Sequence, residues 1–198
     1  MKTPLILIIV LLFTSPVWAK VNVTERTKTY TISGKNGQEL SRSIVKKGLK
    51  AVNTRHAIAT TQTRLRIRNV KTAIRRNRCV VTDVDVDLSL TYTYPRWVDR
   101  NKASPRIRKA WDKFYAQVVR HEEQHGRIAK DFARDVSKLV KRASGRVSRD
   151  CKDFGLTQRR KLERAASRSA RRHARFDRRE GRAFSRVRRL QRSLLRAQ

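Results

Sequence analysis

The stretch PRIRKAWDKFYAQVVRHEEQHGRIAKDFARDVSKLVKR, residues 105–142, decides the fold. Its large apolar residues recur at steps of three or four, which is the spacing of one face of an α-helix. They are Ile107, Trp111, Phe114, Val118, Ile128, Phe132, Val136 and Leu139. Ser104 and Pro105 are a typical cap and first-turn residue, so we expect the helix to begin there and to run towards Arg142. The pattern predicts a long helix that packs one face on a core.

The same helical face carries the motif His121-Glu122-Glu123-Gln124-His125. Residues four apart on a helix lie about 6 Å from each other, so both imidazoles can bind one cation. Glu122, one residue further round the helix, can take a proton from a metal-bound water. The alternative is that both histidines are core residues hydrogen-bonded to neighbours. We predict one Zn²⁺, with His121 and His125 as ligands and Glu122 as catalytic base.

A catalytic zinc site needs a third protein ligand, because the fourth position is left to water. His173 and Glu180 lie on the apolar face of a later helical segment, and we prefer Glu180. Asp131 is the other candidate, but an unbroken helix would turn it about 80° away from His121. For His173 and Glu180 the alternative is a polar residue at the edge of a helix interface.

Residues 80–94 alternate between apolar and polar side chains, as expected of a half-buried strand that Pro95 ends. The face that we expect to be buried carries Val84, Val86, Leu88, Leu90, Tyr92 and Tyr94. The spacing of Asp83, Asp85 and Asp87 is that of a solvated strand face, so we assign them no metal. Further strands are expected at 28–33 and 57–68, and a short helix at 39–47.

The remaining segments complete an α+β fold. Residues 156–198 are rich in arginine and keep an apolar step of three or four, which predicts one long basic amphipathic helix. We therefore expect a zincin-like core over 20–155, with a small antiparallel or mixed sheet packed on the long motif-bearing helix. The helix of 156–198 should pack on this core.

Residues 1–19 have the pattern of a secretory signal peptide. Lys2 precedes a nine-residue apolar run, and Val17-Trp18-Ala19 is a small-residue cleavage site. We predict export to the periplasm or medium, cleavage after Ala19 and no transmembrane segment afterwards. In an oxidising compartment, the only two cysteines, Cys79 and Cys151, are expected to form one disulfide.

The chain of 198 residues has 50 lysines and arginines against 16 acidic residues, a net charge of +34. Such a charge attracts polyanions, although it also serves as a solvated surface. This favours a rival hypothesis of a non-enzymatic envelope protein that binds anionic polymers or lipids. Nucleic acid is not the partner we expect in vivo, because export separates the protein from the chromosome and no base-reading motif is present.

Several motifs occur in a recognisable order: Tyr30-x-Ile32-x-Gly34, Cys79 before Val-Thr-Asp-Val-Asp-Val, the segment 94–97 (Tyr-Pro-Arg-Trp), and Trp111 ten residues before the histidine motif. Together with the late Cys151 they resemble a bacterial domain-of-unknown-function family described as predicted secreted zinc-dependent proteases. The resemblance spans about 30–181. It implies a secreted zinc peptidase that acts on peptide or protein substrates.

One motif departs from that family. Its late helix often ends in Tyr-Asp-x-x-Thr-x-His-Gly, whereas residues 176–181 here read Phe-Asp-Arg-Arg-Glu-Gly. If the family's histidine is a zinc ligand, Glu180 is its nearest replacement in this chain. The leading hypothesis is therefore an exported zinc metallopeptidase with His121, His125 and Glu180 as ligands.

Overall fold

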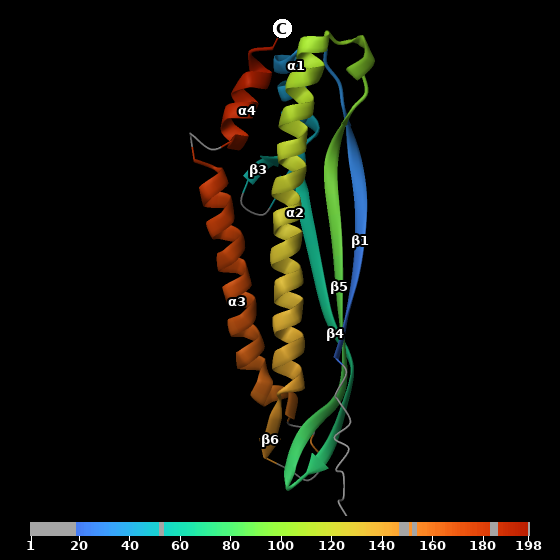
Figure 1. The fold of residues 1–198 in the computed structure, drawn as a ribbon, viewed down its shortest axis with the longest axis vertical. Coiled ribbons are helices and arrows are strands. Elements are labelled where there is room, and N and C mark those ends of the chain that lie inside the picture. Colours follow the sequence, from blue (N-terminus) through green and yellow to red (C-terminus); the bar gives the residue numbers. More distant parts are fainter. Residues whose placement is uncertain (1–18, 52–53, 147–150, 152–153, 183–185, 198) are drawn as a thin grey trace, which may run out of the picture.

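The structure, a computed structural model, describes residues 19–51, 54–146, 151, 154–182 and 186–197. Figure 1 shows a long, narrow molecule in which most elements run along the same axis. In chain order the elements are β1 (Ala19–Ile32), α1 (Gly37–Lys47), β2 (Leu49–Ala51), β3 (Thr54–Ala57), β4 (Thr60–Arg75), β5 (Arg78–Trp97), the 3-10 helix η1 (Arg100–Lys102), α2 (Pro105–Lys141), β6 (Ser144–Arg146), α3 (Phe154–Glu180) and α4 (Arg186–Leu195).

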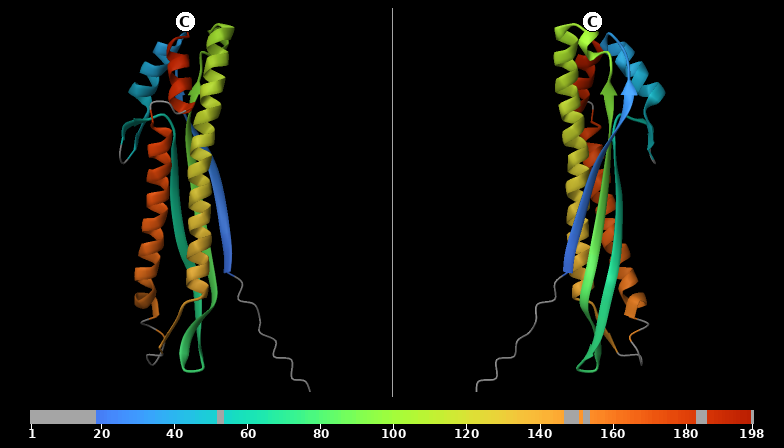
Figure 2. Two further views of the ribbon diagram at one scale, coloured as in Figure 1. Left: turned by 60° about the vertical axis from the view of Figure 1, so that its left-hand side comes forward. Right: turned by 90° about the vertical axis from the view of Figure 1, so that its right-hand side faces the viewer.

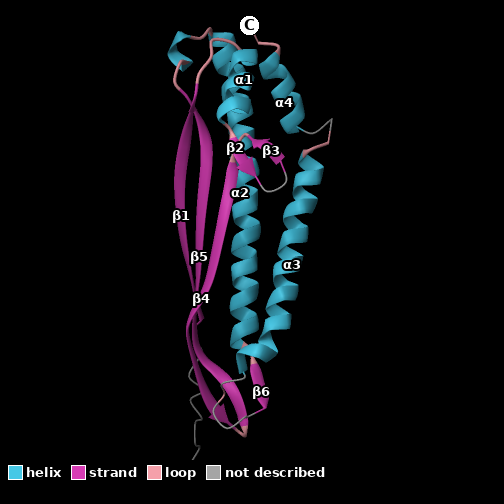
Figure 3. Ribbon diagram, turned by 180° about the vertical axis from the view of Figure 1, so that it is seen from behind, coloured by secondary structure: helices cyan, strands magenta, loops and turns pink. Residues whose placement is uncertain are grey.

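The main sheet is small and mixed, as predicted. Its long strands follow the order β1-β5-β4, so the longest strand, β5, lies in the centre. β5 pairs in parallel with β1 and antiparallel with β4, and the short β6 pairs with the beginning of β5. β2 and β3 form a separate two-stranded sheet, visible in Figure 3. The α+β class with a small mixed sheet is confirmed.

The alternation of β5 separates a core face from a polar face. Each residue of the predicted apolar row is buried, and Val84 and Val86 are completely covered. On the opposite face the aspartates pair across the strands: Asp87 with Arg68 at 2.7 Å, and Asp83 with Lys71 at 3.6 Å. The strand's own pattern therefore determines which side of the sheet the helices cover.

We predicted that β5 would end at Pro95, but the strand continues to Trp97. The pairing with β4 stops at Thr93, so at Pro95 the strand has β1 as its only ladder partner in the main sheet. A proline lacks the N–H of the ladder and is tolerated where a strand is an edge. The rule that proline ends a strand therefore does not hold at this position.

β1 and β4 are longer than predicted, at 14 and 16 residues. Both are edge strands with many exposed polar residues, which weakens the apolar alternation on which the prediction depended. β4 joins β5 through Arg76 and Asn77, which both have positive φ values, of 47° and 59°. Such a two-residue turn matches the twist of a hairpin.

α2 begins and ends as predicted. The Ser104 hydroxyl accepts a hydrogen bond from the Ile107 backbone N–H, and Pro105 is the first helical residue. α2 packs on one face of the sheet, whereas α3 and α4 follow each other along α2, as Figures 1 and 2 show. α2 therefore has two contact surfaces, one towards the sheet and one towards α3 and α4.

The prediction of a single C-terminal helix over 156–198 is wrong, because this part of the chain forms two helices, α3 and α4. α3 ends at Glu180, and the Gly181 N–H closes its last turn on the Asp177 carbonyl at 2.7 Å. Glycine is the usual residue just beyond a helix end. α4 reaches α1, where the Gly37 N–H donates to the Ala197 carbonyl at 3.1 Å.

The predicted disulfide between Cys79 and Cys151 is present, with a Cα–Cα distance of 5.7 Å. It links the beginning of β5 to the segment between β6 and α3. The predicted signal peptide lies almost entirely outside the described residues. Within the described ranges, no helix combines the length and the apolar composition needed to cross a membrane.

Candidate metal centre

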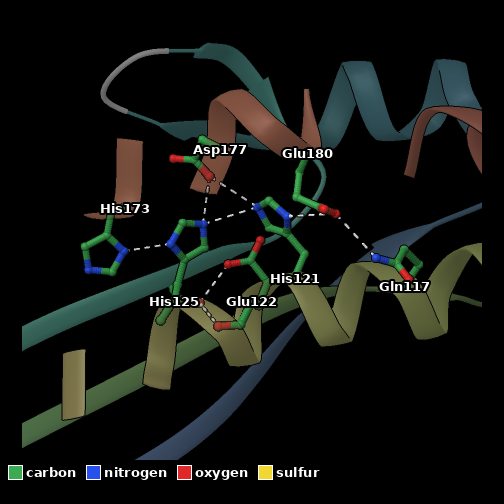
Figure 4. Close-up of polar contacts among 8 residues, drawn as sticks. Gln117, His121, Glu122, His125, His173, Asp177 and Glu180 are labelled. Atoms are coloured by element: carbon green, nitrogen blue, oxygen red, sulfur yellow. Dashed lines mark hydrogen bonds and ion pairs between the residues drawn. The ribbon is translucent and has the colours of Figure 1, made fainter. Parts of the chain in front are cut away.

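Two histidines near the middle of α2 and one aspartate in the last turn of α3 converge on one point. His121 Nε2 and His125 Nε2 lie 3.2 Å apart. Asp177 Oδ1 lies 2.9 Å from His125 Nε2 and 3.4 Å from His121 Nε2. Figure 4 shows the carboxylate facing both rings across the helix interface.

The spacing of these three atoms suits a tetrahedral cation. Ligands about 2.0–2.1 Å from a zinc ion in tetrahedral geometry are separated from one another by about 3.3 Å. The observed separations of 2.9, 3.2 and 3.4 Å surround this value. The three atoms therefore form one triangular face of a zinc tetrahedron, with the fourth corner left for a further ligand.

A cation also satisfies these atoms better than a proton does. Two imidazole nitrogens and a carboxylate oxygen all approach one another, and a single proton can bridge only one pair of them at a time. One metal ion accepts electron pairs from all three. The chemistry of the donor set, two nitrogens and one oxygen, is typical of catalytic zinc sites.

Asp177 is held in its charged form. Burial opposes this charge, but the hydrogen bonds from His121 and His125 and their positive charge keep the pKa of the Asp177 carboxyl well below its usual range. Burial likewise opposes the charging of His121, yet the hydrogen bond that its imidazole donates to Asp177 and the nearby charges of Glu122, Asp177 and Glu180 raise the pKa of that imidazole. The site therefore favours positive charge at its centre.

His173 orients the second histidine. Its Nδ1 lies 2.7 Å from Nδ1 of His125, on the side of that ring away from the metal position. Burial, followed by the charge of His125, lowers the pKa of His173. A neutral His173 ring can accept a proton from His125 Nδ1, and in that tautomer the electron pair of His125 Nε2 is free to bind a metal ion. Metal-binding histidines commonly have such an outer partner.

The first histidine has a weaker outer partner. Its Nδ1 is buried and makes no hydrogen bond. Glu180 Oε2 lies 4.0 Å from this atom and also accepts a 3.4 Å hydrogen bond from Gln117. Glu180 is therefore close enough to orient His121 after a small movement, but Asp177 is the carboxylate nearest the two Nε2 atoms.

Glu122 points to the sheet side of α2. Its side chain is only 6% exposed and accepts a 2.7 Å hydrogen bond from the Thr61 hydroxyl of β4. The same hydroxyl donates to the Glu122 backbone carbonyl at 3.1 Å. Figure 4 draws this contact together with the two histidines. The negative charge of Glu122 contributes to the raised pKa of His121, so β4 fixes the orientation of a carboxylate that acts electrostatically on the first histidine.

Phe176 forms an apolar wall of the site. Its ring centroid lies 4.7 Å from that of His121 and 5.2 Å from that of His125. The side chain of Asp177, by contrast, is 53% exposed. The centre is therefore packed between the helices on one side and open to solvent on the other, where a water or a substrate carbonyl can enter.

The structure brings together most of the predicted site residues. His121, Glu122 and His125 share the site, and His173 and Glu180 contact or approach its histidines. Asp131 does not: its carboxylate pairs with Arg172 at 2.6 Å and with Arg134. Asp177, which was not among the predicted ligands, lies nearer the two Nε2 atoms than our preferred third ligand, Glu180, does.

Asp177 was missed although the sequence carried a signal for it. His173, Asp177 and Glu180 follow one another at steps of four and three, so they lie on one face of α3. The predicted ligands were the two ends of this row, His173 and Glu180. Two acidic residues three apart on one helix face are equally plausible ligands until the register of the helix pair is known.

These observations define the class of the protein: an α+β protein in which two long helices hold a candidate metal centre. A comparison with family models matches residues 27–184 to the family described as "Bacterial protein of unknown function (DUF922)", and the chain belongs to this family. No curated protein and no solved structure matches the chain.

Proposed function

We propose that the protein is an exported zinc metallopeptidase with a zincin-like site. The observation that carries the proposal is the triangle formed by His121 Nε2, His125 Nε2 and Asp177 Oδ1, with sides of 2.9–3.4 Å. Three protein ligands with an open fourth position are typical of catalytic zinc sites rather than structural ones. Export is inferred from residues 1–19 alone.

Zinc held by these residues would lower the pKa of a bound water to about 7 and polarise the substrate carbonyl. Glu122 then acts as the base that takes the proton of the attacking water and returns it to the leaving amine. Thr61 positions Glu122 through the 2.7 Å hydrogen bond. His173 keeps the His125 imidazole turned towards the centre, and Glu180, 4.0 Å from His121 Nδ1, would do the same for His121 after a small movement.

The proposal is tested by the variant Glu122→Gln, compared with Glu123→Gln. Glutamine keeps the size of Glu122 and an acceptor for Thr61, but it cannot take a proton. Glu123 is exposed and has no assigned role, so it supplies a matched control in the same helical turn. Each protein is assayed for zinc by elemental mass spectrometry and for cleavage of an internally quenched peptide library.

We expect about one zinc per chain in the wild type and in both variants. Loss of the general base should lower kcat/KM of Glu122→Gln by about 100-fold or more, whereas Glu123→Gln should resemble the wild type. Full peptidase activity in Glu122→Gln would refute the mechanism. A protein that binds no zinc at neutral pH, even after incubation with the metal, would refute the site.

A second candidate function is favoured by the arginine row on α3, where Arg160, Arg164, Arg168 and Arg171 line one shallow surface. The protein would then bind anionic envelope polymers or lipids without catalysis. This predicts binding that weakens steeply with salt and that survives the double variant His121→Ala/His125→Ala. Negligible binding to such polymers at low salt would exclude this function.

A further inference from the structure

A basic groove separates the beginning of α2 from α4. It has a volume of about 550 Å³, and six of its nine lining residues are cationic. They are Arg106, Lys109, Lys113, Arg189, Arg192 and Arg196. No acidic residue lines the groove. Within the described part of the chain, no ion pair joins Arg106, Lys109, Lys113 or Arg196 to a carboxylate.

The cations extend along both walls of the groove. Arg106 and Lys113 are seven residues apart on α2, and Arg189 of α4 is seven residues before Arg196, which directly follows the end of that helix. At about 1.5 Å per residue, each wall carries positive charge over about 10 Å. An extended chain with several negative groups fits this distribution better than one compact anion does, because a compact anion would reach only part of each wall.

The groove is in line with the metal centre. Arg106, Lys109, Lys113, Gln117 and His121 follow one another along α2 at steps of three or four, so they lie on one face. Figures 1 and 3 show α4 and α3 following each other along this side of α2. From His121 the distance along the helix axis is about 12 Å to Lys113 and about 22 Å to Arg106.

We propose that this groove binds a cluster of acidic side chains in the peptide substrate, on one side of the bond held at the metal centre. An extended peptide advances about 3.3 Å per residue, so the acidic cluster should lie about four to seven residues from that bond. This inference rests on the proposed peptidase function and adds the substrate class. Arginine and lysine in a groove without acidic residues recognise carboxylates by charge-assisted hydrogen bonds.

The groove variant is Arg106→Gln/Lys109→Gln/Lys113→Gln. All three side chains are exposed, so glutamine should be accommodated without loss of the fold. The matched control, called the strand variant, is Arg26→Gln/Arg64→Gln/Arg66→Gln, three exposed residues of the edge strands β1 and β4, which lowers the net charge by the same amount. The comparison separates the groove from the general effect of a positively charged protein.

The substrates are internally quenched peptides with three glutamates placed four to seven residues from a central cleavable segment, on either side. Control peptides carry glutamine in place of glutamate. If three surface ion pairs each contribute about 0.5 kcal/mol, kcat/KM should be about tenfold higher for the glutamate peptides. The groove variant should lose this preference, and the strand variant should keep it.

Binding is measured separately, because it does not depend on catalysis. The Glu122→Gln protein, alone and combined with each triple variant, is titrated with the same fluorescent peptides and followed by anisotropy. We expect the glutamate peptide to bind about tenfold more tightly than the glutamine peptide, and only the groove variant to abolish the difference. This result would support the groove even if no peptide were cleaved, in which case the peptidase proposal alone would fail.

Three results would overturn the inference. The first is equal binding of glutamate and glutamine peptides by the wild-type groove. The second is an equal loss of binding in the groove variant and the strand variant, which would indicate an effect of net charge alone. The third is groove-dependent binding of phosphatidylglycerol vesicles or inorganic polyphosphate without discrimination between the peptides, which would assign the groove to a phosphate polymer or a lipid surface.

Discussion

Asp177 Oδ1 lies 2.9 Å from His125 Nε2, so α3 provides the negative charge of a centre whose imidazoles both come from α2. A two-histidine pair on one helix is electrically neutral and binds a dication weakly. The carboxylate from the neighbouring helix would supply charge and a third ligand to the proposed zinc. The proposed metal centre therefore depends on the packing of α3 on α2.

The first prediction concerns the third ligand. Asp177→Asn should lower zinc affinity by at least about 100-fold, because loss of a direct ligand costs no less than loss of an outer partner. Glu180→Gln should lower the affinity by about tenfold or less, since Glu180 lies behind His121. The affinities are measured by competition with a chromophoric chelator at neutral pH.

The control is Asp131→Asn, which removes an acidic side chain from the same helix pair without touching the centre. Its partners are Arg172 and Arg134, so zinc affinity should not change. If Glu180→Gln caused the larger loss and Asp177→Asn the smaller one, the ligand assignment would be reversed, as the sequence alone had suggested.

The second prediction concerns His173, which contacts a ligand but not the metal position. His173→Phe keeps a ring of similar shape and removes the acceptor for His125 Nδ1. Zinc affinity should fall by about 10- to 100-fold, with little change in the thermal stability of the metal-free protein. Equal affinity in the variant and the wild type would mean that the 2.7 Å contact does not orient His125.

Much of the fold followed from periodicity. The apolar alternation of β5 and the apolar steps of three or four in α2 each predict which face is buried. An element that buries only one face carries its apolar residues at the structural repeat of that element, two for a strand and 3.6 for a helix. The edge strands β1 and β4 have much of their length exposed on both faces, so their ends could not be predicted. The division between α3 and α4 depended on Gly181, whose role the continuous amphipathic pattern concealed.

The site was predictable only where its residues are local in sequence. His121, Glu122 and His125 belong to one helical turn, so their relation is fixed by helix geometry. The choice between Asp177 and Glu180 depends on the axial register of α3 against α2, which no local pattern determines. Thr61 gave no signal at all, because its role arises from the position of β4 beside α2.

The third prediction is a pH dependence of stability at Glu25. The hydrogen bond from Lys130 lowers the pKa of Glu25 below 4.5; burial opposes the shift, and Tyr92 and the charge of Lys130 add to it. A depressed pKa stabilises the fold above the unfolded-state pKa, and this contribution is lost as the pH falls through the folded-state pKa.

Urea unfolding of the wild type and Glu25→Gln at about pH 7 and about pH 3 measures this contribution. Both side chains of the ion pair are substantially exposed, so the difference at neutral pH should be about 1 kcal/mol or less. It should shrink at the acid pH. A difference that grew towards acid would contradict the assignment.

The fourth prediction concerns the disulfide. Cys79 and Cys151 close a loop with a sequence separation of 72 residues. In the chain-entropy account, such a cross-link stabilises the fold by about 4 kcal/mol by restricting the unfolded chain. Cys79→Ser/Cys151→Ser should therefore unfold at a markedly lower denaturant concentration. The wild type with its disulfide reduced should behave similarly. An unchanged denaturant midpoint in both proteins would show that the unfolded chain between Cys79 and Cys151 is already restricted without the disulfide.

The last prediction concerns the contact between Gly126 and Tyr92. A Cβ atom at Gly126 would lie 2.0 Å from the Tyr92 hydroxyl, where α2 crosses β5. Helix propensity alone predicts that Gly126→Ala stabilises the protein by up to about 1 kcal/mol. Overpacking at this contact should instead destabilise the protein by about 1–3 kcal/mol.

In a Tyr92→Phe background the hydroxyl is absent, so the loss of stability caused by Gly126→Ala should be smaller. A double-mutant cycle from denaturant unfolding measures this difference. If Gly126→Ala destabilised the wild type and the Tyr92→Phe protein equally, the Tyr92 hydroxyl would not be the reason for a glycine at position 126.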